Sequence, residues 1–283
     1  MREGGGVLMA RFVRKNVGTS HSYLLDGNRI PGVTTVIGIL DKPALVNWAA
    51  KESASFAIEN WERLTALPLL ERAAQIEKAR YNTNRKAVVK GNRIHALGEK
   101  LAHGETVEVP LEIQSQVSAY ARFLDTWGLE VFATETPVAH TEWCFGGTFD
   151  LIAETPRFGR ALMDIKTGKG VYSEVALQLN AYAGCDLRLV SSEEIGPRGG
   201  RKTVWHEAPM PAIDSLLVAH VLDDTVEMVP VKLDPAIFES FLHMLEIYET
   251  WVKRTGWDFR DEESFDPPVG KPVYPEDVPA ARP

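Results

Sequence analysis

The stretch that most constrains the fold consists of two apolar segments that each carry one aspartate. Residues 142–154 contain Asp150, residues 160–167 contain Asp164, and a short turn at residues 156–159 separates them. Extended segments joined so closely are typical of a β-hairpin. The pattern therefore predicts a sheet in which two carboxylates approach each other.

The rest of the chain divides into a mostly helical first half and a second half with more strands. Proline and glycine mark most of the expected boundaries. The expected elements are a hairpin in 11–30; helices at 33–40, 43–60, 68–81, 85–103 and 110–127; strands at 129–140, 142–154 and 160–167; a helix at 172–190; a polar loop at 191–202; strands at 203–208, 213–221 and 225–232; and a helix at 235–254. Helices flanking a mixed central β-sheet make an α/β (or α+β) fold.

This order favours one domain over residues 1–256. Its parts are a helical portion at 31–128, a core at 129–190, and strands and a helix at 203–254. Residues 257–283 are acidic and rich in proline, and we expect an irregular tail there.

Composition excludes several functional classes. The net charge of −8 argues against a protein that coats nucleic acid through bulk positive charge, although a local basic groove is compatible with it. Lysines and arginines do cluster upstream of the strands, where they form either such a groove or a solvated helix face. The cluster comprises Arg72, Lys78, Arg80, Arg85, Lys86, Lys90, Arg93 and Lys100.

The two cysteines, Cys144 and Cys185, cannot supply a four-cysteine iron–sulfur cluster or zinc site, and we expect packed thiols. Low cysteine content and the lack of a signal-peptide pattern favour a reducing, cytoplasmic setting. No run of about 18 apolar residues occurs, so no membrane span is expected. The phosphate-binding motif of ATPases is also missing, so no ATP is expected.

Together with Lys166, the two aspartates suggest a metal-binding catalytic site. Strand residues two apart share a face, so Asp164 and Lys166 point the same way, and Asp150 is expected to share a face with Ile152. Paired carboxylates repel each other unless a cation lies between them, and Mg²⁺ or Mn²⁺ suits oxygen ligands. An Asp-x-Lys sequence alone is usually a surface ion pair. The ordered spacing, with apolar Leu162 and Met163 leading into Asp164, favours a site instead.

Three further residues each allow two interpretations, as part of a functional site or as part of the packed core. His95 lies on a helical stripe with Gly91 and Ile94, where it could be a ligand or a hydrogen-bonded core residue. Gln178 and Tyr182 are four residues apart and share a helix face, which could line a site or simply pack.

As an ordered set these motifs resemble the PD-(D/E)XK nuclease superfamily, in its RecB-like exonuclease branch. The matching segments are Gly91-x-x-x-His95, Gly147-Thr148-Phe149-Asp150, Asp164-Ile165-Lys166 and Gln178-x-x-x-Tyr182. Upstream, residues 30–37 resemble the Pro-x-Val-Thr segment of phage-type and mitochondrial single-strand exonucleases in this branch. The match covers roughly residues 30–182.

The resemblance implies a restriction-endonuclease-like core and specific residue roles. Lys166, Asp150, Asp164 and Glu135 would be catalytic, with Glu130 and Glu142 as competitors for the place of Glu135. His95, Asp150, Asp164 and the Ile165 backbone carbonyl would bind Mg²⁺ or Mn²⁺. Gln178, Tyr182, Thr167, Lys169 and Arg93 would contact DNA.

By this resemblance the chain is a metal-dependent deoxyribonuclease, most simply an exonuclease that acts on DNA ends in replication, recombination or repair. A recombination or annealing protein is an expected partner, and a phage source, with action in the host cytoplasm, fits the resemblance. Two alternatives stay open: a DNA- or partner-binding subunit that cuts little, and a structure-specific endonuclease.

Overall fold

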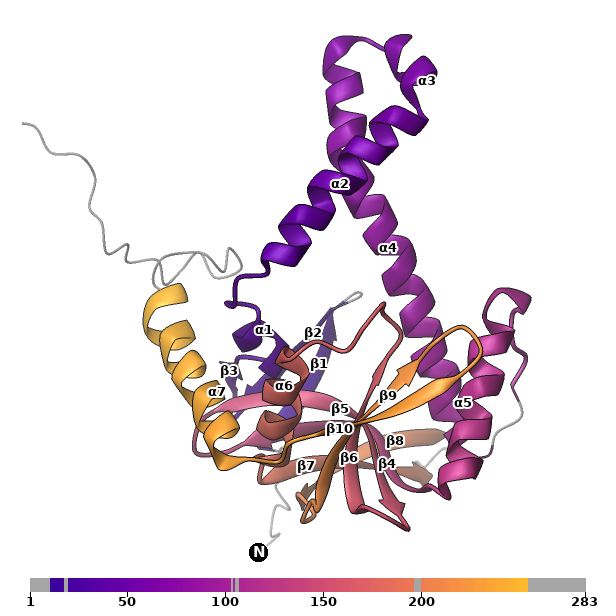
Figure 1. The fold of residues 1–283 in the computed structure, drawn as a ribbon. Coiled ribbons are helices and arrows are strands. Elements are labelled where there is room, and N and C mark those ends of the chain that lie inside the picture. The colour runs from indigo at the N-terminus through magenta and orange to yellow at the C-terminus, as the bar shows by residue number, and fades with distance from the viewer. Residues whose placement is uncertain (1–10, 18–19, 103, 105–106, 196–199, 254–283) are drawn as a thin grey trace, which may run out of the picture.

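A computed structural model describes residues 11–17, 20–102, 104, 107–195 and 200–253. Within these residues seven strands form a mixed sheet in the order β10-β9-β6-β5-β4-β7-β8 (Figure 1). β6 and β9 run parallel, and the other neighbours are antiparallel. The strands are β4 (Glu130–His140), β5 (Phe145–Thr155), β6 (Gly159–Lys166), β7 (Leu187–Ile195), β8 (Arg201–Pro209), β9 (Ser215–Val221) and β10 (Val226–Val231). The predicted mixed sheet flanked by helices is therefore confirmed.

A second, smaller sheet contains the predicted hairpin and lies against the first. Its strands are β1 (Phe12–Val17), β2 (Ser20–Leu25) and β3 (Asn28–Ile30), paired in chain order. The turn between β2 and β3 uses Asp26 and Gly27, both with positive φ (51° and 82°), as an Asp-Gly turn requires.

Helices cover both faces of the large sheet. The described helices are α1 (Val33–Ile37), α2 (Pro43–Glu59), α3 (Trp61–Thr65), α4 (Leu69–Ala102), η1 (Leu111–Ile113), α5 (Gln114–Trp127), α6 (Glu174–Ala183), α7 (Pro235–Ile247) and the π-helical turn η2 (Tyr248–Val252). Two helix ends follow residue preferences: Asp234 caps α7 by accepting from the Ala236 N–H at 2.9 Å, and Gly128 ends α5 in the left-handed region.

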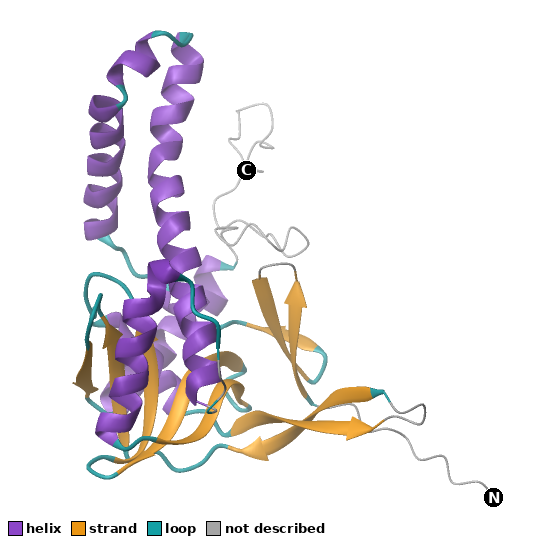
Figure 2. Cartoon of the chain, turned by 90° about the vertical axis from the view of Figure 1, so that its right-hand side faces the viewer, coloured by secondary structure: helices purple, strands orange, loops and turns teal. Residues whose placement is uncertain are grey.

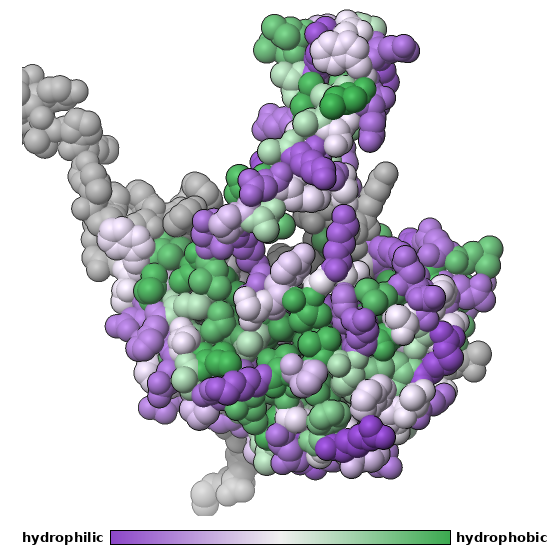
Figure 3. All heavy atoms as spheres, in the orientation of Figure 1, coloured by the Kyte–Doolittle hydropathy of each residue, from purple (hydrophilic) through white to green (hydrophobic). Residues whose placement is uncertain are grey.

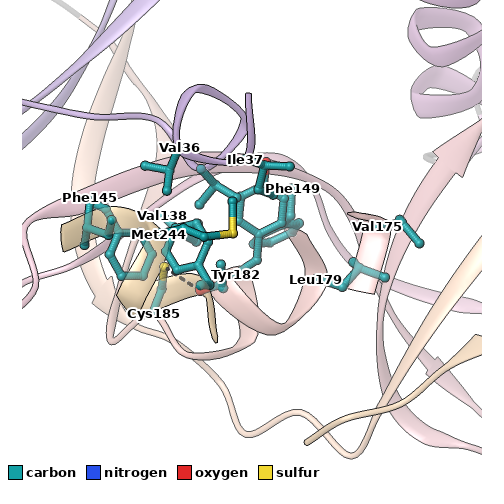
Figure 4. Close-up of a cluster of buried hydrophobic side chains, with 14 of the residues drawn as sticks. Val36, Ile37, Val138, Phe145, Phe149, Val175, Leu179, Tyr182, Cys185 and Met244 are labelled. Carbon is teal, nitrogen blue, oxygen red and sulfur yellow. Dashed lines mark hydrogen bonds between the residues drawn. The ribbon is translucent and has the colours of Figure 1, made fainter. Parts of the chain in front are cut away.

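One hydrophobic core lies on each face of the large sheet. The first packs α1, α6 and α7 against residues such as Phe149, Ile152 and Leu162; Figure 4 shows part of this cluster, with Val36 and Ile37 of α1 over Phe149. The second packs α5 and the end of α4 against the other face. A third, smaller cluster joins the small sheet to Ala139 and Leu189 of the large one.

Helices α2, α3 and the first part of α4 project from this body as an antiparallel arm (Figures 1 and 2). None of the described residues of α2 is buried. In the space-filling view, hydrophobic side chains appear among hydrophilic ones along the arm (Figure 3). The exposed large apolar residues of the arm include Leu45, Val46, Ile58, Trp61, Leu69, Leu70 and Tyr81.

Five predicted elements differ from the structure. The two helices expected at 68–81 and 85–103 are one continuous helix, α4. The helix expected at 172–190 ends at Ala183, because Gly184 is followed by a chain reversal that begins strand β7. Much of the loop expected at 191–202 is instead the β7–β8 hairpin. The helix expected to reach residue 254 changes at Tyr248 into the π-helical turn.

Two further expectations concern the C-terminal tail and membrane-spanning segments. The irregular tail expected at 257–283 lies outside the described residues. No helix within the described part of the chain is long and apolar enough to cross a membrane.

Candidate metal centre

Three acidic residues lie in one row across β4, β5 and β6. Glu135 falls opposite Asp150, and the β5–β6 register, continued by one step, places Asp150 opposite Asp164. The flanking pairs that fix this register are Thr134–Leu151, Thr136–Phe149 and Leu151–Met163. The predicted approach of the two aspartate-bearing strands is thus present, and Glu135 joins them from the strand on the other side.

The sheet is irregular at this row. Phe149 and Ile152, three residues apart, both pack in the first core, so side chains do not alternate regularly between them. On the partner strand Glu135 has a positive φ of 41°, which is uncommon for a residue other than glycine. The regular pleat therefore breaks where the acids lie, and the expectation that Asp150 and Ile152 share one face stays a prediction.

Helix α4 brings His95 to this break. Its Nδ1 lies 3.5 Å from Asp150 Oδ2, and one ligand atom each from His95, Glu135 and Asp150 lie within 4.8 Å of one another. Asp150 Oδ2 also accepts the Ile165 N–H at 2.7 Å, which ties β5 to β6. His95 therefore faces the carboxylates, whereas its neighbour Ile94 fills the core with 2% exposure.

Asp164 belongs to an adjoining hydrogen-bonded network. Lys166 Nζ lies 2.6 Å from Asp164 Oδ2, and Gln178 Nε2 donates to Asp164 Oδ1 at 3.0 Å. The Gln178 side chain further accepts from Lys166 Nζ at 3.3 Å and lies 3.5 Å from the Tyr182 hydroxyl. Helix α6 thus holds the lysine and the buried acid in a fixed relation.

The electrostatics of this row favour a cation. Burial, and then the charge of Asp150, raises the pKa of Glu135 to about 7. The same two causes raise the pKa of Asp164 to about 7, although Lys166 and Gln178 act in the opposite direction. Both acids resist ionisation because burial disfavours the charged form and because the charge of Asp150 repels a further negative charge.

A divalent cation fits this set of residues. Carboxylate oxygens and an imidazole nitrogen are suitable ligands for Mg²⁺ or Mn²⁺, and His95, Glu135 and Asp150 already converge. Asp164 and the Ile165 carbonyl stay predictions as ligands. Of the three candidate acids before β5, Glu130 and Glu142 are exposed and only Glu135 lies in this cluster.

The predicted DNA-contacting residues fall in four places. Gln178 and Tyr182 face the acids. Thr167 lies beside α4, because a Cβ added to Gly91 of that helix would lie 3.0 Å from Thr167 Oγ1. Lys169 is exposed on the following loop, whose Gly168 carbonyl bonds His220 Nε2 at 2.9 Å. Arg93 lies outside the cluster and pairs with Glu112 at 2.5 Å.

The cysteines take no part in the centre. Cys185 is buried and lies 3.4 Å from the Ala181 carbonyl oxygen, as expected for a packed thiol. Cys144 is exposed, so the expectation of a packed thiol is wrong there, because the chain turns out to solvent between β4 and β5.

One contact at the site had no signal in the sequence. The Tyr23 hydroxyl and Thr148 Oγ1 are 2.9 Å apart, which links the small sheet to the strand that carries Asp150. The two residues are 125 positions apart, so no local spacing could reveal the pair. Alternation in β2 could have indicated only that Tyr23 faces inward.

Comparisons with known proteins add no identification. No protein-family model matches the chain, and no curated protein is significantly similar to it. The functional argument therefore depends on the residues and on their geometry.

Proposed function

We propose that the chain is a divalent-metal-dependent DNA nuclease, most simply an exonuclease that hydrolyses phosphodiester bonds at DNA ends. The observation that carries this proposal is the convergence of His95, Glu135 and Asp150 beside the Asp164–Lys166 pair. The ordered resemblance to RecB-like nucleases adds support from the sequence.

His95, Glu135 and Asp150 would hold the cation, with Asp164 and the Ile165 carbonyl as further candidates. When bound, such a cation polarises a phosphate oxygen and lowers the pKa of water. The site's residues contribute separately: Lys166, oriented by Asp164 and Gln178, offers an ammonium group to a phosphate oxygen or to a water molecule. Gln178 and Tyr182 add neutral polar groups from α6.

The test is digestion of DNA by the full chain. Linear single- and double-stranded substrates labelled at the 5′ or the 3′ end are incubated with Mg²⁺ or Mn²⁺, with and without chelator. We expect chelator-sensitive loss of end label, with the labelled end giving the polarity. Cutting of a covalently closed circle would instead support the endonuclease alternative, and metal-independent binding without cutting would support the binding subunit.

Variants locate the activity in the proposed site. Asp164→Asn and Lys166→Gln should each lower the turnover rate by about 10²–10³-fold, the scale seen when one group that stabilises transition-state charge is removed. Lys232→Gln is a matched control, because Lys232 also pairs with an aspartate, Asp234, but on the surface. Equal activity of the site variants and the control would refute the assignment.

A further inference from the structure

An arginine lies on the inner face of the small sheet, which is otherwise largely apolar. Arg14 of β1 is the cross-strand partner of Tyr23 of β2, so the two side chains lie on the same face. Phe12 and Leu25, which form another cross-strand pair on that face, are 0% and 3% exposed. Arg14 thus stands at the edge of a packed interface instead of on the solvent side.

That interface adjoins the metal centre. The Tyr23 hydroxyl bonds Thr148, two residues before Asp150 on β5. The charge of Arg14 acts on both Tyr23 and Glu135. Glu135 lies on β4 and Lys166 on β6, the two strands that flank β5 in the large sheet.

The guanidinium group of Arg14 has unused hydrogen-bonding capacity. Its Nε is shielded from solvent, yet it makes no hydrogen bond with the described residues. Leaving a sheltered donor unsatisfied typically costs about 1–3 kcal/mol. Such a donor is usually explained by a ligand or a bound water.

We propose that Arg14 forms a phosphate-binding subsite that receives a phosphate of the DNA backbone next to the metal centre. Guanidinium binds phosphate through two parallel hydrogen bonds, a geometry that lysine does not reproduce. Tyr23 positions the subsite by fixing the small sheet to Thr148. This inference rests on the proposed function, because it takes a DNA phosphate as the ligand.

The test measures binding to DNA in which single phosphates have lost their charge. Oligonucleotides with one methylphosphonate at each linkage near the end are titrated against the full chain in Ca²⁺. We expect wild type to bind one linkage position at least 10-fold more weakly when it is neutral. Arg14→Gln should bind unmodified DNA at least 10-fold more weakly and be insensitive to neutralisation at that position.

Lys15→Gln is the matched control, since it removes one charge from the adjacent, exposed position of β1. It should keep the wild-type pattern. An Arg14→Gln variant that keeps the full methylphosphonate sensitivity of wild type would overturn the subsite, even if its overall affinity fell, because a merely structural arginine would give that result.

A second variant covers the case in which Arg14→Gln does not fold. Arg14→Lys keeps the charge but not the paired hydrogen bonds, so we expect reduced sensitivity at the same linkage; unchanged sensitivity would again overturn the subsite. Failure of the proposed nuclease function would give a result different from failure of the subsite. In that case wild-type protein would bind DNA but would not cut it in Mg²⁺ or Mn²⁺.

Discussion

At the scale of single residues, the site depends on a close contact between Gly147 and Tyr182. A Cβ added to Gly147 would lie 2.2 Å from a ring carbon of Tyr182, whose side chain is 3% exposed. Glycine at this position lets the α6 ring lie directly against β5. The Gly-Gly sequence before the Asp150 segment is thus explained by packing.

Gly147→Ala should therefore destabilise the protein by roughly 1–3 kcal/mol, the usual range for overpacking a core. Denaturant unfolding followed by circular dichroism measures the loss. Gly168→Ala is the control near the same site, because nothing lies within 4 Å of its added Cβ. A Gly147→Ala variant as stable as Gly168→Ala would contradict the packing explanation.

A second residue-scale prediction concerns acid stability. Partial burial acts to raise the pKa of Asp186, but hydrogen bonds from the Thr141 N–H (2.7 Å) and hydroxyl (2.6 Å) outweigh it, so the net pKa is lowered. A carboxyl with a lower pKa in the folded state stabilises above its unfolded pKa, about 3.9, and this contribution disappears as pH falls through the folded pKa.

Asp186→Asn should accordingly reduce the drop in melting temperature between pH 5 and pH 2.5. Thr141→Val, which removes one of the two donors, should give an intermediate drop. Equal pH profiles for wild type and Asp186→Asn would show that this carboxyl does not contribute to acid sensitivity.

Sequence reasoning predicts best those candidate residues whose signal is local. Strand spacing and the apolar residues before Asp164 place Asp150, Asp164 and Lys166 on neighbouring strands, and the structure has them on β5 and β6. Glu135 was one of three candidate acids, and only the sheet register could select it. Arg14, the residue of the proposed phosphate subsite, had no signal in the sequence, because its setting is an interface between two sheets, which no spacing within β1 encodes.

At the scale of elements, the largest surprise is the continuity of α4. The polar run Asn82-Thr83-Asn84 has weak helix propensity and suggested a break. In the structure α2 packs alongside α4, and such tertiary support commonly overrides propensity. Strand β7 was missed for a related reason: its pairing with β4 and β8 is non-local, whereas its sequence continues an apparently helical stretch.

The projecting arm should be separable from the core. No described residue of α2 is buried, and Leu64 of α3, which is buried, belongs to none of the three core clusters. Replacing residues 56–76 with a short Gly-Ser linker should therefore leave the melting temperature within a few degrees of wild type. Differential scanning fluorimetry measures this, with circular dichroism as a check for loss of helix alone. A fall of ten degrees or more would show that the arm tip supports the core.

At the scale of the whole molecule, the candidate site is assembled from distant parts of the chain. α4 supplies His95, the central strands supply the acids and Lys166, and α6 supplies Gln178. The small sheet adds Tyr23. The helical first half therefore contributes side chains to the site, in addition to covering one face of the sheet.

This assembly makes metal binding a property of the folded state. A ligand that binds only the folded chain stabilises it by about 2.7 kcal/mol at one hundred times its Kd. Saturating Mn²⁺ or Mg²⁺ should therefore raise the melting temperature by several degrees, and chelator should reverse the change.

Glu135→Gln should abolish most of this rise, because it removes an anionic oxygen from the cluster of His95, Glu135 and Asp150. Glu130→Gln is the matched control, an exposed acid on the same strand, and should respond to metal as wild type does. If both variants keep the full metal-induced rise, the cation binds elsewhere. If wild type itself shows no rise with either metal, the cluster of His95, Glu135 and Asp150 does not bind a divalent cation.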